Sequence, residues 1–136
     1  MSELNELLKE LINRVDGLIG IVLTDRDGIV ITSVSQDEHS TELIETLPLT
    51  STYSLVSDQA NKMGLGRSEI LVSKFDNFQL VQFNYTEFFL NLISDEVNNI
   101  GILMDLKPEL NSITDLISNL VKEVNPEEGE EEIENN

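Results

Sequence analysis

The sequence contains no cysteine and no tryptophan among its 136 residues, and only eight residues are Lys or Arg. Without cysteine, disulfides, thiolate zinc sites and thiol nucleophiles are excluded. Asp and Glu number 26, which gives a formal net charge of −18 at pH 7. A chain this acidic is a poor binder of nucleic acid, and it is equally unsuited to docking directly on an anionic membrane surface.

Long apolar runs are also missing. The longest of them fall far short of the roughly 20 residues that a membrane-spanning helix needs. The N-terminal segment MSELNELLKELINR has neither the apolar core of a signal peptide nor the Arg-rich pattern of a transit peptide. We therefore expect a soluble intracellular protein, without direct membrane insertion, that reaches any membrane only through a partner.

Side chains able to carry out chemistry are few. His39 is the only histidine, and it lacks the positioned partner that a general base needs. The sequence contains no G-x-S-x-G elbow, and Gly64-Leu65-Gly66 follows a predicted helix instead of a strand, unlike a nucleotide-binding loop. Asp25 and Asp27 fit a tight turn better than a calcium loop. We predict a protein with no catalytic residues, no cofactor and no metal.

The first third of the chain predicts a helix, two strands and a loop. Apolar residues at helical spacing predict a helix over 3–15. The nearly continuous apolar run 18–24 predicts a central strand that is covered on both faces. An Asp-Gly pair at 27–28 supplies the positive φ of a hairpin turn, and 29–34 form the return strand. The polar stretch 35–48 predicts an exposed loop.

A second helix is predicted over 50–63, and it has two stripes. One stripe holds mostly larger apolar side chains and the other holds small polar ones: Tyr53, Val56, Ala60 and Met63, and Thr50, Ser54, Ser57 and Asn61. A stripe of small residues lets another backbone approach closely, and the alternative is a solvated polar face. Periodicity alone leaves both interpretations open.

The rest of the chain predicts three strands and a last helix. Consecutive strands joined by tight turns are antiparallel, and the sequence places them at 68–75, 78–85 and 88–94. The segment 100–105 is either a sixth strand or the opening of the last helix. Apolar periodicity predicts that helix over 106–124, with Pro108 in its first turn.

The C-terminal segment 126–136 has six Glu and no basic residue. Such a segment cannot bury enough apolar surface to fold, so we predict a folded domain over 1–125 followed by an acidic disordered tail. The order α-β-β-α-β-β-β-α indicates an α+β fold with helices around an antiparallel sheet. Unpaired backbone groups along the strand 68–75 would be available to a second chain, which favours an interaction module.

Several segments resemble the roadblock/dynein light chain family, over about Leu4 to Val124. The most specific are Asp25-Arg26-Asp27-Gly28, Ser51-Thr52 with Asp58-Gln59, Lys62-Met63-Gly64-Leu65, and Val81-Gln82-Phe83-Asn84. The resemblance implies a three-layer sandwich, in which a five-stranded antiparallel sheet has the second helix on one face and the first and last helices on the other. It also favours 100–105 as the lead-in to the last helix.

The same resemblance implies a non-catalytic scaffold that forms an obligate heterodimer with a second roadblock-fold adaptor. In the family, the two second helices join and the strands that follow them pair edge to edge. In this chain those elements are 50–63 and 68–75. The resemblance therefore implies a dimer interface at Thr50, Tyr53, Ser54, Val56, Ser57, Gln59, Ala60, Asn61, Met63, Ile70 and Val72.

The branch of the family that the sequence is most similar to works in the Ragulator complex, on the cytoplasmic face of late endosomes and lysosomes. There a lipidated anchor protein holds the heterodimers, and the assembly binds Rag GTPases for amino-acid-dependent TOR activation and brings the kinase MEK near ERK. Two alternatives stay open. One is a stand-alone small-GTPase regulator, although Arg14, Arg26 and Arg67 do not stand out as an arginine finger. The other is a dynein-type light chain, which lacks a last helix such as 106–124.

Overall fold

The computed structural model describes residues 2–98, 100–112 and 115–119. The predicted acidic tail over 126–136 and the end of the predicted last helix lie outside these residues. Along the chain the elements are α1 (Ser2–Arg14), β1 (Leu18–Asp25), β2 (Val30–Ser35), α2 (Glu38–Thr46), α3 (Leu49–Lys62), β3 (Ile70–Lys74), β4 (Phe78–Asn84), β5 (Phe88–Asp95), α4 (Ile100–Met104) and α5 (Lys107–Ser112).

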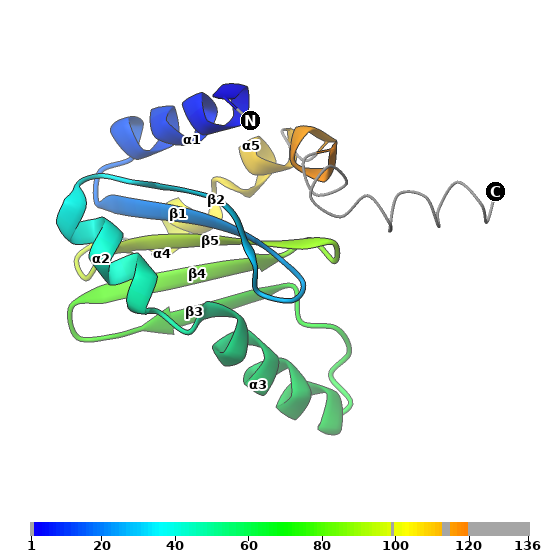
Figure 1. Ribbon diagram of the computed structural model, residues 1–136. Helices are drawn as coiled ribbons and strands as arrows, with labels where there is room; N and C mark the ends of the chain where they lie inside the picture. The colour runs from blue at the N-terminus through cyan, green and yellow to red at the C-terminus, as the bar shows by residue number, and fades with distance from the viewer. Residues whose placement is uncertain (1, 99, 113–114, 120–136) are drawn as a thin grey trace.

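The five strands form one antiparallel sheet in the order β2-β1-β5-β4-β3 (Figure 1). This arrangement confirms the predicted α+β fold with its five-stranded sheet. β1 lies between β2 and β5, and nearly all of its side chains are buried, as its continuous apolar sequence predicts. β3 is an edge strand, because it pairs only with β4.

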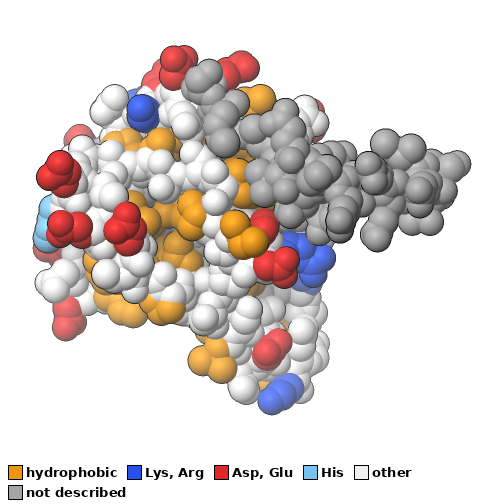
Figure 2. Space-filling view, in the orientation of Figure 1, with side chains coloured by type: hydrophobic (Ala, Val, Ile, Leu, Met, Phe, Trp, Pro, Cys, Tyr) orange, Lys and Arg blue, Asp and Glu red, His pale blue; other side chains and the backbone are white. Residues whose placement is uncertain are grey.

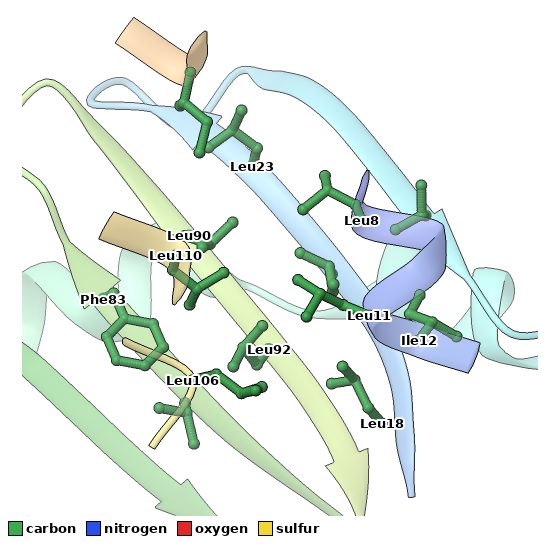
Figure 3. Packing of buried hydrophobic residues seen from close by; sticks show 14 of the residues in the cluster. Leu8, Leu11, Ile12, Leu18, Leu23, Phe83, Leu90, Leu92, Leu106 and Leu110 are labelled. Carbon is green, nitrogen blue, oxygen red and sulfur yellow. The ribbon is translucent and has the colours of Figure 1, made fainter. Parts of the chain in front are cut away.

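One face of the sheet is covered by α1, α4 and α5, and the main hydrophobic core lies there (Figure 3). The apolar stripe of α1 points into this core through Leu4, Leu8, Leu11 and Ile12. Leu106 and Leu110 close the core from the C-terminal side. An exposed ion pair of 2.5 Å between Arg14 and Glu109 also joins α1 to α5.

The opposite face is covered by α2 and α3, and its core is smaller. It contains Val22, Leu80 and Ile93 from the strands, with Ile44 from α2 and Leu49 from α3. Together the two helical layers and the sheet make the predicted three-layer sandwich (Figure 1).

The predicted loop over 35–48 is wrong, because most of it forms α2. The Asp37 side chain caps this helix by accepting a 2.8 Å hydrogen bond from the backbone N–H of Ser40. Gly20 makes room for Ile44 on the sheet, since an added Cβ would lie 2.3 Å from the Ile44 Cδ1 atom. One short apolar patch in a polar stretch gave too weak a periodicity to predict this helix.

The ambiguous segment 100–105 is helical and does not form a strand. α4 covers Ile100–Met104, and a turn at Asp105 and Leu106 separates it from α5. α5 begins at Lys107, which agrees with the predicted start of the last helix near 106 and with 100–105 as its lead-in. Pro108 occupies the first turn of α5, where its missing N–H costs no helical hydrogen bond.

Candidate interaction surface

The first half of α3 is anchored on the sheet. Tyr53 is buried, and its ring packs against that of Phe89 with centroids 4.9 Å apart. The Tyr53 hydroxyl donates a 2.7 Å hydrogen bond to the backbone oxygen of Ser68, just before β3. The Asn84 side chain donates to the same oxygen at 3.0 Å. These bonds fix the angle between α3 and the start of β3.

A buried polar network that was not predicted from the sequence adds a second anchor. The Gln82 amide donates to the backbone oxygen of Leu49 and to Asn91 Oδ1, both at 2.9 Å. Asn91 in turn donates to the backbone oxygen of Val22. Two polar side chains at inward-facing positions of central strands were the available signal. The network ties the first residue of α3 to three neighbouring strands.

The second half of α3 leaves the sheet, and its apolar side chains face solvent. Figure 1 shows the helix extending past the strands. Leu55 is 65% exposed, Val56 is 41% exposed and Met63 is 72% exposed. Leu65, directly after the helix, is exposed as well. We define the α3 outer surface as Leu55, Val56, Gln59, Met63 and Leu65. Neither Leu55 nor Leu65 was among the predicted interface residues.

The free edge of β3 lies beside this helix in the chain and offers backbone groups. The backbone oxygen of Glu69 accepts from Asn84, and the backbone N–H of Phe75 donates to Phe78. Because antiparallel strands alternate between bonded and non-bonded pairs, the backbone groups of Ile70, Val72 and Lys74 point away from β4. The β3 edge can therefore accept another strand.

The predicted interface residues occupy three different environments. Tyr53 is buried within its own chain, where it supports α3. The half-buried residues are Thr50, Ser57, Ala60 and Ile70, and the exposed ones are Ser54, Val56, Gln59, Asn61, Met63 and Val72. No second chain is present to test their contacts, so the interface stays a prediction.

Two arginines lie in a cleft beside α3. The cleft has a volume of about 240 Å³, and Arg26, Arg67, Ser54 and Ser57 are among the residues that line it. Arg67 donates a 2.5 Å hydrogen bond to the Thr86 hydroxyl. Asp58 also lines this cleft, and Arg67 lies 4.0 Å from the Glu69 carboxylate, so carboxylates balance the charge of the two arginines.

Other sites offer little chemistry. Among the described residues, no three His, Asp or Glu side chains are grouped so that they could hold a metal ion. No helix in the described part of the chain combines the length and hydropathy needed to span a bilayer. The Ser40 hydrogen bond lowers the pKa of Asp37, and burial raises the pKa of Tyr85. Neither residue belongs to α3 or β3.

Comparison with known proteins decides the family. Residues 2–121 match the family described as "Mitogen-activated protein kinase kinase 1 interacting". The chain belongs to this family. It is 31% identical over 121 residues to Ragulator complex protein LAMTOR3-B of Xenopus laevis, which covers 89% of this chain and 98% of the relative. It is also 31% identical over 122 residues to the LAMTOR3 homolog of Drosophila melanogaster, with 90% and 98% covered.

Solved structures show that this chain has the roadblock fold. A Roadblock/LC7 domain from Streptomyces avermitilis superposes with a TM-score of 0.61 at 22% identity, over 90% of this chain and 94% of that one. MglB of Myxococcus xanthus superposes with a TM-score of 0.68 at 15% identity, over 88% and 98%. These similarities confirm the roadblock fold that the sequence resemblance implied.

Proposed function

We propose that this chain is a non-catalytic scaffold subunit of a Ragulator-type complex, and that it acts by pairing with a second roadblock-fold adaptor. Its relatives are named as Ragulator proteins, which supports the complex. The observation that carries the pairing is the exposed, apolar α3 outer surface followed by the unpaired β3 edge. An exposed apolar helix face and an exposed strand edge are both typical of protein interfaces.

The names of the relatives also suggest a location and further partners for the heterodimer. We propose that a lipidated anchor protein holds the heterodimer on the cytoplasmic face of late endosomes or lysosomes. There the assembly would bind Rag GTPases for TOR activation by amino acids. The Ragulator names of the relatives support the complex in which this would happen. It would also bring MEK near ERK, and the name of the matching family supports a kinase kinase partner.

The first experiment is size-exclusion chromatography with light scattering. The chain is measured alone and after coexpression with a second roadblock-fold adaptor. We expect a 1:1 heterodimer. A chain that remains a monomer or homodimer beside the adaptor would contradict the proposal, and would favour a stand-alone small-GTPase regulator or a dynein-type light chain.

Two variants map the interface. Val72→Pro removes an N–H on the free edge of β3 and leaves the bonds to β4 intact, so we expect loss of the heterodimer with the fold retained. Val72→Thr keeps the N–H and should still pair. On the helix, Val56→Arg should weaken pairing, whereas Val97→Arg, in the exposed loop before α4, should not. Equal behaviour of each variant and its control would contradict this interface.

A further inference from the structure

One groove of the molecule is lined by none of the residues of the α3 outer surface. It has a volume of about 640 Å³ and runs between α2, the start of α3 and the β1–β2 hairpin. Val22, Val30, Ile44, Leu47 and Leu49 are among its apolar lining residues. Thr50 is the one predicted dimer-interface residue among those that line it. Pairing through α3 and β3 therefore leaves most of this groove unexplained.

The groove exists because α2 is short and the hairpin turn is held apart from it. α2 packs on the sheet through Ile44, over Gly20. At the other end the hairpin turn contacts α3, since a Cβ at Gly28 would lie 2.9 Å from the Thr50 hydroxyl. Between these two contacts Val22 and Thr24 of β1 are buried, but Val30 and Ser33 of β2 stay exposed. Val30 is consequently a large apolar side chain that the fold leaves more than half exposed.

The charged side chains that line the groove have one sign. The charged residues that line it are Asp27 and Glu45, and no Lys or Arg lines it. In Figure 2, hydrophobic side chains gather in the middle of this face, with acidic side chains on either side of them. An apolar floor between carboxylates is complementary to apolar side chains flanked by positive ones.

We propose that this groove binds a short segment of a partner protein whose apolar side chains are flanked by Lys or Arg. The apolar residues of the segment would cover Val30 and Leu47, which are apolar lining residues that the fold leaves at least partly exposed, and its basic residues would lie beside Asp27 and Glu45. Because the groove is open on this face of the molecule (Figure 2), it suits an extended segment better than an enclosed small molecule. The proposal does not depend on heterodimer formation.

Three synthetic heptapeptides test the proposal on the full-length chain. The first is Lys-Lys-Leu-Leu-Phe-Lys-Lys, the second replaces its apolar residues with serine, and the third replaces its lysines with glutamate. Binding is followed by fluorescence anisotropy, and its location by the methyl NMR signals of Val22, Leu47 and Leu49. We expect the first peptide to bind and to shift these signals, and the other two to bind at least tenfold more weakly.

Variants separate a groove from general attraction to an acidic protein. Glu45→Lys reverses a charge that lines the groove, and we expect it to weaken binding about tenfold. Glu42→Lys makes the same change on the same helix outside the lining residues, and we expect less than a twofold effect. Ser33→Trp fills the groove and should abolish binding, while circular dichroism checks the fold.

Three results would overturn the proposal. One is tight binding of the serine peptide, which would mean attraction by charge alone. Another is an equal loss of binding in the Glu45→Lys and Glu42→Lys variants. The third is a set of NMR shifts that map to the α3 outer surface instead of the groove. Repeating the titration with the heterodimer shows whether the groove stays accessible in it, and loss of binding there would contradict a separate site.

Discussion

The two faces of the sheet use their helices differently. On one face, the apolar stripe of α1 packs into the hydrophobic core of the domain, and Leu4 and Leu8 are fully buried. On the other face, α3 buries Leu49 and Tyr53 at its start and then exposes Leu55 and Met63. Both helices are amphipathic, but only α1 buries its apolar stripe within the monomer. The apolar surface left over on α3 is therefore the strongest structural sign of a partner.

The faces also differ in how their helices are held. α1, α4 and α5 rest on a continuous hydrophobic core. α2 and α3 depend more on specific hydrogen bonds, namely the Asp37 cap and the contacts of Gln82 and Tyr53. Close packing leaves a helix little room to change its orientation. Hydrogen bonds fix the direction of a helix at only a few points. We infer that the α1 face stabilises the domain and that the α3 face presents it to partners.

The sharpest test of this difference truncates one leucine on each face. Leu8→Ala removes a fully buried side chain, so we expect a loss of about 2–5 kcal/mol in the free energy of unfolding. Leu55→Ala removes an exposed side chain, and we expect a change within about 0.5 kcal/mol. Urea denaturation of the isolated chain, followed by circular dichroism, measures both.

The same pair should reverse its order when pairing is measured. With the second adaptor present, Leu55→Ala should weaken the heterodimer, because Leu55 is part of the α3 outer surface. If Leu55→Ala instead destabilises the isolated chain as much as Leu8→Ala does, the contrast between the two faces is wrong.

A smaller effect is expected from the buried polar network under α3. Gln82→Leu removes the donor to Leu49 and leaves Asn91 Oδ1 without this partner. We expect a loss of about 1–3 kcal/mol in the free energy of unfolding, because a buried acceptor is left unsatisfied. A double variant that carries both Gln82→Leu and Asn91→Leu tests whether the two side chains contribute to stability together. If the double variant is as stable as the natural chain, the network serves specificity and adds no net stability.

Much of this fold could be predicted from the sequence, because its strands and α1 have strong periodic signals. The strand 18–24 and the hairpin turn at 27–28 correspond to β1 and its connection, and Gly28 has the expected positive φ of 91°. α2 was missed because its stability comes from the Asp37 cap and from the space above Gly20. The Asp37–Ser40 cap is a local contact, but the packing of Ile44 over Gly20 is a tertiary contact that a local pattern does not contain.

The candidate site was predictable only in outline. Sequence resemblance singled out the helix and strand that carry the exposed apolar surface and the free edge, but helical spacing could not show which side of α3 faces the sheet. Tyr53 and Val56 fell in one predicted stripe, yet Tyr53 is buried and Val56 is exposed. The orientation is fixed by the hydroxyl of Tyr53 and the amide of Gln82, which bond to backbone oxygens far along the chain. Such contacts become visible only in three dimensions.

The last prediction concerns the Asp37 cap at the start of α2, on the face of the sheet that α2 and α3 cover. The backbone N–H of Ser40 donates to the Asp37 carboxylate and lowers the pKa of this group below its ordinary value of 3.8. A lowered pKa in the folded state means that the carboxylate stabilises α2 fully above pH 3.8. This contribution is lost as the pH falls through the lower pKa of the folded state. NMR titration of the Asp37 carboxyl carbon should therefore give a midpoint below 3.8.

Asp37→Asn provides the matched control, because asparagine can cap a helix without titrating. In this variant the amide signal of Ser40 should lose its acid-dependent shift, while α2 stays folded at neutral pH. A midpoint at or above 3.8 for Asp37 would mean that the cap does not form in solution. The wall that α2 gives to the groove would then depend on Ile44 alone, and the groove would be less defined than the two anchors of α3.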